Sequence, residues 1–161
     1  MSIALIESEL RAALTALNVL QWPTRWPNEP WPTGIEVAPG NLPVDVNGAP
    51  IPCMLAEDIT GDDTSAIGQG VAQGGAGRLS TRLGTLRVYL LVGQNTGATL
   101  IQTQADNIAL GFKRQTIYAD PPTWARLTTM DPHVDAPDPN VETGDRYVRM
   151  VTVPWIFEYR N

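Results

Sequence analysis

The sequence predicts an α+β domain, in which a mixed, mainly antiparallel sheet carries an N-terminal helix and a central helix on one face. Three observations support this fold class: an amphipathic pattern at the start of the chain, a strand–turn–helix unit in its middle, and a long alternating stretch at its end. Long segments rich in Pro and Gly join these elements. With 161 residues and no internal repeat, the chain is expected to form a single domain over residues 1–161.

The first element is an amphipathic helix of about four turns. Apolar residues from Ile3 to Leu17 recur every three or four positions, with Glu7, Glu9 and Arg11 between them. Ser2 can cap the first turn, and the two glutamates suit the positive end of the helix dipole. Acidic side chains near the start disfavour both a signal peptide and a membrane-surface anchor. We therefore expect the apolar stripe to pack on the sheet.

The strand–turn–helix unit spans residues 82–115 and is the best-specified local structure of the chain. Its first part alternates between two faces, with Leu86, Val88, Leu90 and Val92 on one of them, which predicts a largely buried strand. Turn-forming residues follow, and then apolar residues recur at helical spacing as far as Phe112. The unit contains no catalytic motif.

The last element is predicted to be a long strand from Arg146 to Tyr159. Alternation places one set of seven side chains on a single face: Tyr147, Arg149, Val151, Val153, Trp155, Phe157 and Tyr159. Pro154 predicts a bulge or an unpaired edge near that point, because proline has no backbone N–H to donate.

Shorter strands are predicted at residues 52–57, 116–118 and 124–130. Asn47-Gly48 indicates a hairpin turn before the first of them. The glycine-rich stretch from Thr60 to Gly77 is interpreted either as an arm that becomes ordered against a partner or as simple disorder.

Residues 131–140 form a Pro- and Asp-rich loop. Asp131, His133 and Asp135 could in principle bind a divalent ion there. A solvated loop is favoured over a metal site, because prolines hold the segment open and no supporting polar residues are evident.

The segment from Gln21 to Pro32 is unusual in composition, with three Trp-Pro steps. Each proline removes a donor and restricts the residue before it to extended geometry, so a helix or a central strand is excluded. We favour an ordered loop laid over the core, built from Trp22, Trp26, Asn28, Glu29 and Trp31. The alternatives are a polyproline-type recognition arm and an aromatic platform for sugars or bases.

Charge and residue counts narrow the possible functions. A net charge of −6 disfavours binding to nucleic-acid phosphates. Cys53 is the only cysteine, so neither an intramolecular disulfide nor a multi-cysteine zinc site is possible, and it is interpreted as a small buried apolar residue. His133 and Lys113 are the only examples of their types, and neither lies beside a serine motif. The sequence predicts no enzyme, no cofactor and no bound metal.

The order of elements resembles the tail terminator-like proteins of long-tailed bacteriophages and gene transfer agents. Three stretches carry the resemblance: Trp26–Trp31 with its Asn-Glu step between aromatics, Leu86–Tyr89 leading through Gly93 and Gly97 into a helix, and Val153–Tyr159 at the end. Together they span most of the chain, although each motif is short. Residues 33–46 and 68–77 are longer than the family pattern.

The resemblance implies a structural protein of the virion tail or neck, assembled in the host cytoplasm. Six copies would form a ring that caps the tail tube, ends its polymerisation and joins it to a head-side connector or stopper protein. DNA would pass through an acidic lumen without specific binding, and no membrane is involved. A head-to-tail ring needs two different patches on each subunit. The candidate interface residues are Gly70, Gly74, Gly77, Arg78, Arg82, Trp155, Phe157 and Tyr159.

Two other functions stay open at this point. One is a different neck or head–tail connector component. The other is a carbohydrate- or peptide-binding module that uses Trp22, Trp26 and Trp31, and burial of these rings would disfavour it.

Overall fold

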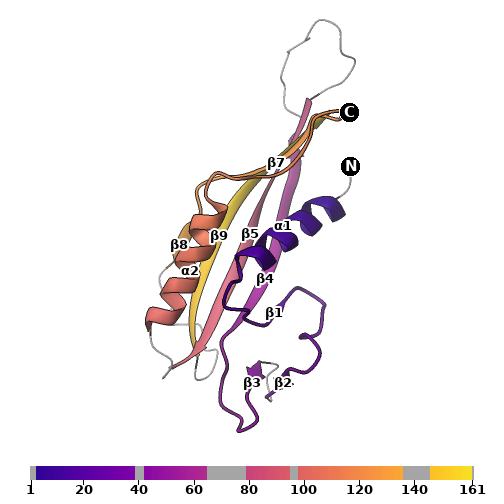
Figure 1. Cartoon of the computed structure of the whole chain (residues 1–161). Coiled ribbons are helices and arrows are strands. Elements are labelled where there is room, and N and C mark those ends of the chain that lie inside the picture. The colour runs from indigo at the N-terminus through magenta and orange to yellow at the C-terminus, as the bar shows by residue number, and fades with distance from the viewer. Residues whose placement is uncertain (1–2, 39–41, 65–78, 95–97, 136–145, 161) are drawn as a thin grey trace, which may run out of the picture.

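The computed structural model describes residues 3–38, 42–64, 79–94, 98–135 and 146–160 (Figure 1). The elements, in chain order, are α1 (Ile3–Leu17), β1 (Thr24–Arg25), β2 (Glu36–Val37), β3 (Pro43–Val44), β4 (Cys53–Thr64), β5 (Leu79–Gly93), α2 (Ala98–Phe112), β6 (Thr116–Asp120), β7 (Ala125–Thr129), β8 (His133–Asp135) and β9 (Arg146–Arg160). The α+β class and both expected helices are confirmed.

The main sheet is mixed and curves into a half-barrel, with strand order β1-β4-β5-β9-β7-β6. β1 runs parallel to β4, whereas β4–β5, β5–β9, β9–β7, β7–β6 and β8–β9 are antiparallel pairs. β2 and β3 form a separate small ribbon. Figure 1 shows β4, β5 and β9 as long twisted strands that run side by side, with both helices beside them.

The core lies between the helices and one face of this sheet, here called the concave face. Its strand residues lie at even positions of β4 and β5 and at odd positions of β9 and β7, as the register requires. These include Leu86, Leu90, Val151 and Val153, none of which is exposed to solvent. α1 contributes Ile6, Leu10 and Leu14, and α2 contributes Ile101, Ala105, Ile108 and Phe112. The apolar stripe expected on each helix is therefore the part that packs.

Trp155 is the largest fully buried side chain of this core, and its position depends on Gly84 directly opposite it on β5. A Cβ atom at Gly84 would lie 2.1 Å from Cζ2 of Trp155, which is far inside van der Waals contact. Trp155 Nε1 donates a hydrogen bond of 2.8 Å to Asp58 on β4. The indole therefore spans the three central strands at a point that only glycine leaves open.

β9 is a central strand, because it pairs with β5 along one side and with β8 and β7 along the other. β8 pairs with β9 up to Thr152, and β7 pairs with it from Trp155. Pro154 lies between these two partners, where its carbonyl accepts a hydrogen bond from the N–H of Met130. The bulge or unpaired edge predicted at Pro154 is not seen on the β5 side, where Thr85 pairs with Pro154 in an unbroken register. On the other side, the missing N–H falls where one neighbouring strand replaces the other.

Among the described residues, one end of the other, convex face of the sheet is closed by a loop. There Arg146 donates hydrogen bonds to the carbonyls of Ile51 and Pro43 and to Sγ of Cys53. These bonds hold the segment that precedes β4 against the sheet. Burial raises the pKa of the Cys53 thiol to about 11, although Arg146 opposes this shift. Cys53 is fully buried, as its interpretation as a small apolar residue requires.

Two boundaries differ from the prediction. The sequence predicts residues 60–64 as part of the glycine-rich break, but they continue β4, where Thr60, Asp63 and Thr64 pair with β5 across a register shift. It predicts a loop at His133–Asp135, which instead forms β8 on β9. In both places the partner strand supplies the pairing, so the polar local sequence gave no sign of it. The rest of the glycine-rich break, residues 65–77, lies outside the described residues.

Candidate assembly surfaces

The predicted interface residues fall into two groups. Gly70, Gly74, Gly77 and Arg78 lie outside the described residues. The others lie where β5 begins and β9 ends, at the end of the sheet that Figure 1 marks with the C-terminus. Arg82 and Tyr159 are half-buried there, and the ring of Tyr159 stacks on Phe157 with centroids 5.5 Å apart.

Trp155 and Phe157 have a different position from the one expected of interface residues. Each is only 1% exposed, and both belong to the core of the protein itself. Alternation along β9 turns them toward the concave face, where Leu127 on β7 pairs opposite Phe157. Their side chains therefore stabilise the subunit and leave almost no surface for a neighbour.

The Trp-Pro segment contains the short edge strand β1 at Thr24–Arg25 and is otherwise irregular. Trp22 and Trp26 are 6% and 8% exposed and form part of the core cluster. Asn18, at the end of α1, fixes the start of the loop, because its side chain accepts from the N–H of Trp22 and donates to the carbonyl of Trp22. Because the rings of Trp22 and Trp26 are buried, little of either ring is exposed for stacking on a sugar or a base.

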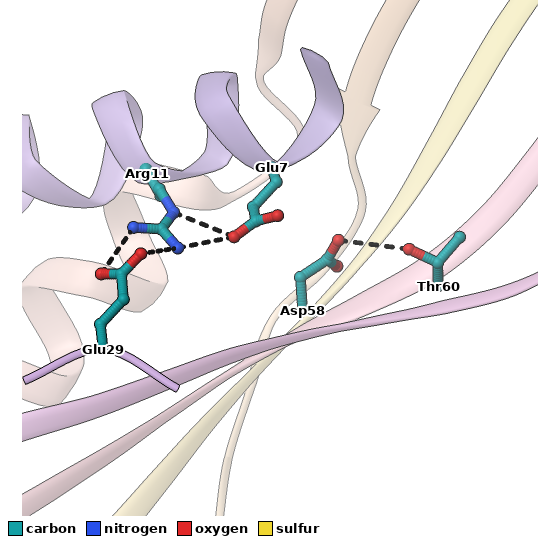
Figure 2. A network of polar contacts seen from close by, with 5 residues as sticks. All are labelled: Glu7, Arg11, Glu29, Asp58 and Thr60. Atoms are coloured by element: carbon teal, nitrogen blue, oxygen red, sulfur yellow. Dashed lines mark hydrogen bonds and ion pairs between the residues drawn. The ribbon is translucent and has the colours of Figure 1, made fainter. Parts of the chain in front are cut away.

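Arg11 clamps this loop onto α1 (Figure 2). Its guanidinium lies 2.6 Å from Glu7 and 2.7 Å from Glu29, and it lies over the ring of Trp26 at 4.5 Å from the centroid. The hydrogen bond from Arg11 lowers the pKa of Glu29, and the same bond contributes most to a raised pKa of Arg11. Glu29 of the expected structural loop therefore acts as the anchor of the segment.

The turn that carries Glu29 depends on its neighbours. Asn28 has a φ of 60°, a left-handed conformation that asparagine tolerates better than most residues. The N–H of Glu29 donates to the carbonyl of Trp26 at 3.2 Å and closes the turn. At the far side of the loop, Arg25 lies over the ring of half-buried Trp31. The Asn-Glu step between aromatics is thus a compact turn held by two cation–π contacts.

Asp58 lies beside this clamp, on β4 (Figure 2). It accepts hydrogen bonds from Trp155 Nε1 and from the hydroxyl of Thr60. Burial raises the pKa of Asp58 and the negative charge of Glu7 adds to the shift, whereas the two hydrogen bonds oppose it. Sequence reasoning missed this residue, because only the fold brings α1, β4 and β9 together.

A second surface missed from the sequence lies on the convex face, away from the end that Arg146 closes. Ile59 and Leu83 are 41% and 44% exposed, and the register places half-buried Pro154 and Ile156 on the same face next to them. We call these four residues the convex patch. The alternation of β5 and β9 could have predicted a second face for these strands, but it could not show that Ile59 and Leu83 are exposed there.

Asp131, His133 and Asp135 are not grouped as ligands in the described structure. Asp131 is held by Arg114 through two hydrogen bonds of 2.8 and 2.9 Å, and this pairing lowers the pKa of Asp131. Within the described ranges, no group of three or more His, Cys, Asp or Glu side chains is placed to hold an ion. No helix among those residues is long and apolar enough to cross a membrane.

Comparison with known proteins supports the fold but gives no family. No family model matches this chain, and no curated protein sequence is similar to it. One solved structure resembles it over 98% of this chain and 96% of that chain, with a TM-score of 0.53 and 12% identical residues. The name of that protein states no activity or partner. At this identity, the likeness shows a shared fold alone.

Proposed function

We propose that this protein is a structural component of a bacteriophage-like tail, a tail terminator whose copies form a ring, six in number by the resemblance. The ring would cap the tail tube, end its polymerisation and contact the head-side connector. Each subunit would use a mainly antiparallel sheet as a rigid frame and would carry out no chemical step. Its place is the tail or neck of a virion assembled in the host cytoplasm.

The observation that carries this proposal is the convex patch. Aliphatic side chains that stay exposed together on a rigid sheet face are typical of a surface covered by a partner. The patch lies on a different part of the surface from the helices, so a head-to-tail contact between unlike patches is available to each copy. The net charge of −6 suits a ring through which DNA slides without binding.

The first test is the mass of the purified protein by light scattering after size exclusion, over a range of concentrations and salt. We expect a shift from the 17.5 kDa subunit toward about six times that mass as concentration rises, by the ring proposed above. Negative-stain images should then show rings with a central hole. A strict monomer at every concentration would contradict a ring that forms without the tail tube.

The convex patch itself is tested by Leu83→Asp. A buried charge at a contact is unfavourable, so this variant should remain a monomer under conditions in which the parent assembles. Leu110→Asp is the matched control, because Leu110 is 72% exposed on α2 and lies outside the patch. If the two substitutions affected assembly equally, the convex patch would not be the contact surface.

A further inference from the structure

The outer side of β4 is an open strand edge over part of its length. β1 pairs with β4 only at Met54 and Leu55. From Glu57 onward, no residue within the described ranges pairs with β4 on that side, although β5 pairs with it along the other. Exposed edges of this kind accept further strands, and proteins usually shorten, bend or cover them.

The backbone groups that face this open side can be identified from one hydrogen bond. The N–H of Met54 donates to the carbonyl of Pro23, so Met54 points its polar backbone groups toward β1. These groups alternate in direction along a strand, so Asp58 and Thr60 point the same way, whereas Glu57 and Ile59 point toward β5. Asp58 and Thr60 therefore present their N–H and carbonyl groups beyond the end of β1.

An open pocket of about 410 Å³ begins at the end of β1, next to this edge. Trp26, Glu29, Ala56, Glu57 and Tyr89 are among the residues that line it. The pocket lies between β4 and the Trp-Pro loop, whose Glu29 is paired with Arg11 of α1. A segment that follows the line of β1 would thus find both backbone partners and room for a side chain.

The charges around the edge indicate the chemistry of such a segment. The cluster in Figure 2 contains three carboxylates, of Glu7, Glu29 and Asp58, but only one guanidinium, that of Arg11. Tyr89 and Arg87 both contact Glu57 on the convex side, so that acid is already partnered. An excess of two negative charges remains beside the open edge, and a basic side chain would neutralise it.

We propose that β4 takes up an extended, basic segment of a partner protein as an additional strand, with main-chain bonds to Asp58 and Thr60 and a Lys or Arg side chain near Asp58 and Glu7. This mode of recognition uses backbone bonds for affinity and side chains for selectivity. A basic segment of a different protein suits the site better than a second copy, because this chain carries a net charge of −6. The inference concerns the monomer, so it holds with or without the proposed ring.

Hydrogen exchange of the full chain tests the open edge. We expect the amides of Asp58 and Thr60 to exchange at least tenfold faster than those of Glu57 and Ile59, whose N–H groups point to β5. Equal protection of all four amides would overturn the proposal, because the edge would then be occupied within the protein.

A titration followed by amide NMR tests the partner chemistry. The probes are an acetylated, amidated peptide of alternating threonine and lysine and its counterpart with glutamate in place of lysine. At millimolar concentration the lysine peptide should shift the signals of residues 57–61 and should do so less at high salt, whereas the glutamate peptide should not. Identical responses to both peptides, or none to the lysine peptide, would overturn the proposal.

Two substitutions of Thr60 distinguish the role of its backbone N–H from the role of its side chain. Thr60→Pro removes the outward N–H without removing a bond to β5, and proline is tolerated at strand edges. Thr60→Val loses the same hydroxyl but keeps the N–H. The lysine peptide should bind the valine variant and should fail to bind the proline variant. Shifts at residues 57–61 that depend on protein concentration without peptide would instead identify a second copy as the occupant and would overturn the choice of a basic partner.

Discussion

At the scale of single residues, the packing of Trp155 against Gly84 is the most restrictive feature of the core. We expect Gly84→Ala to lower the free energy of unfolding by about 1–3 kcal/mol, the usual cost of overpacking. The indole has little freedom to move away, since it is 1% exposed and bound to Asp58. Urea denaturation measures the loss, and near-ultraviolet circular dichroism reports whether the indole shifts.

Gly111→Ala is a useful control, because the added Cβ would also lie 2.1 Å from a neighbouring atom. That atom is Cδ2 of Leu17, the end of a flexible, half-buried side chain. Alanine also favours helices over glycine by about 1 kcal/mol, which offsets the displacement of Leu17. If both alanine variants lost the same stability, the special restriction at Gly84 would be disproved.

Asp58 also predicts how stability depends on pH. Its folded pKa is raised, chiefly by burial, from an ordinary value of 3.8. Between the ordinary and the raised pKa, the folded state binds more protons than the unfolded state, so stability falls as pH rises through this interval. Asp58→Asn keeps an oxygen acceptor for Trp155 but cannot ionise. The parent should therefore lose stability relative to the asparagine variant as pH rises through the interval that begins at the ordinary value of 3.8 and ends at the raised pKa.

At each pH, the free energy of unfolding of the Asp58→Asn variant must be subtracted from that of the parent. This is because Glu29 and Asp131 have lowered pKa values and change stability with pH in the opposite direction to Asp58. Their stabilising effect is lost as pH falls, and it is shared by parent and variant. Urea denaturation at a series of pH values gives the difference directly. A difference that stays constant across the acidic range would show that the pKa of Asp58 is not raised in the folded protein.

At the scale of elements, the spacing of apolar residues predicted those helices and strands that bury one regular face. α1, α2 and the central part of β5 were predicted closely, because each buries one repeating set of apolar side chains. The strands β6 and β7 were also expected, and they do pair with each other. The main exceptions were short or polar pieces, such as β8, whose structure depends on the strand beside them.

The Trp-Pro segment shows which features local sequence can predict and which it cannot. Its prolines predicted an irregular loop over the core; Trp22 and Trp26 are buried, but Thr24–Arg25 forms the short strand β1. The sequence did not predict the ion pair between Arg11 and Glu29 that anchors the loop. These residues lie 18 positions apart and meet only when the loop folds back over α1. The open edge of β4 was hidden for a related reason, because it depends on how far β1 follows its neighbour.

At the scale of the whole molecule, the sheet depends on pairings between distant parts of the chain. β9 is the last element described, yet it lies between β5 and the β6–β7 pair and contributes Val151, Val153, Trp155 and Phe157 to the core. α1, the first element, packs into the same core. Both ends of the chain must therefore be in place before the core closes, and strand pairings of such long range are typical of slow folding.

This arrangement predicts that removal of residues 146–161 abolishes folding rather than weakening it. Truncating a buried Trp or Phe costs about 3–5 kcal/mol each, and a domain of this size has only about 5–15 kcal/mol of stability. Loss of β9 also leaves β5 and β7 without the strand between them. We expect the shortened chain to show no cooperative transition when heated and followed by circular dichroism.

A second truncation distinguishes the central strand from its terminal part. Removing only residues 158–161 keeps Trp155 and Phe157 and takes away half-buried side chains such as Tyr159 and Arg160. This chain should still unfold cooperatively, at a lower temperature than the parent, since it loses the stacking of Tyr159 on Phe157 and the contact of Arg160 with the ring of Trp124. If the longer truncation also unfolded cooperatively, then α1, α2 and the other strands would close a core alone, and β9 would be an addition to the fold rather than its centre.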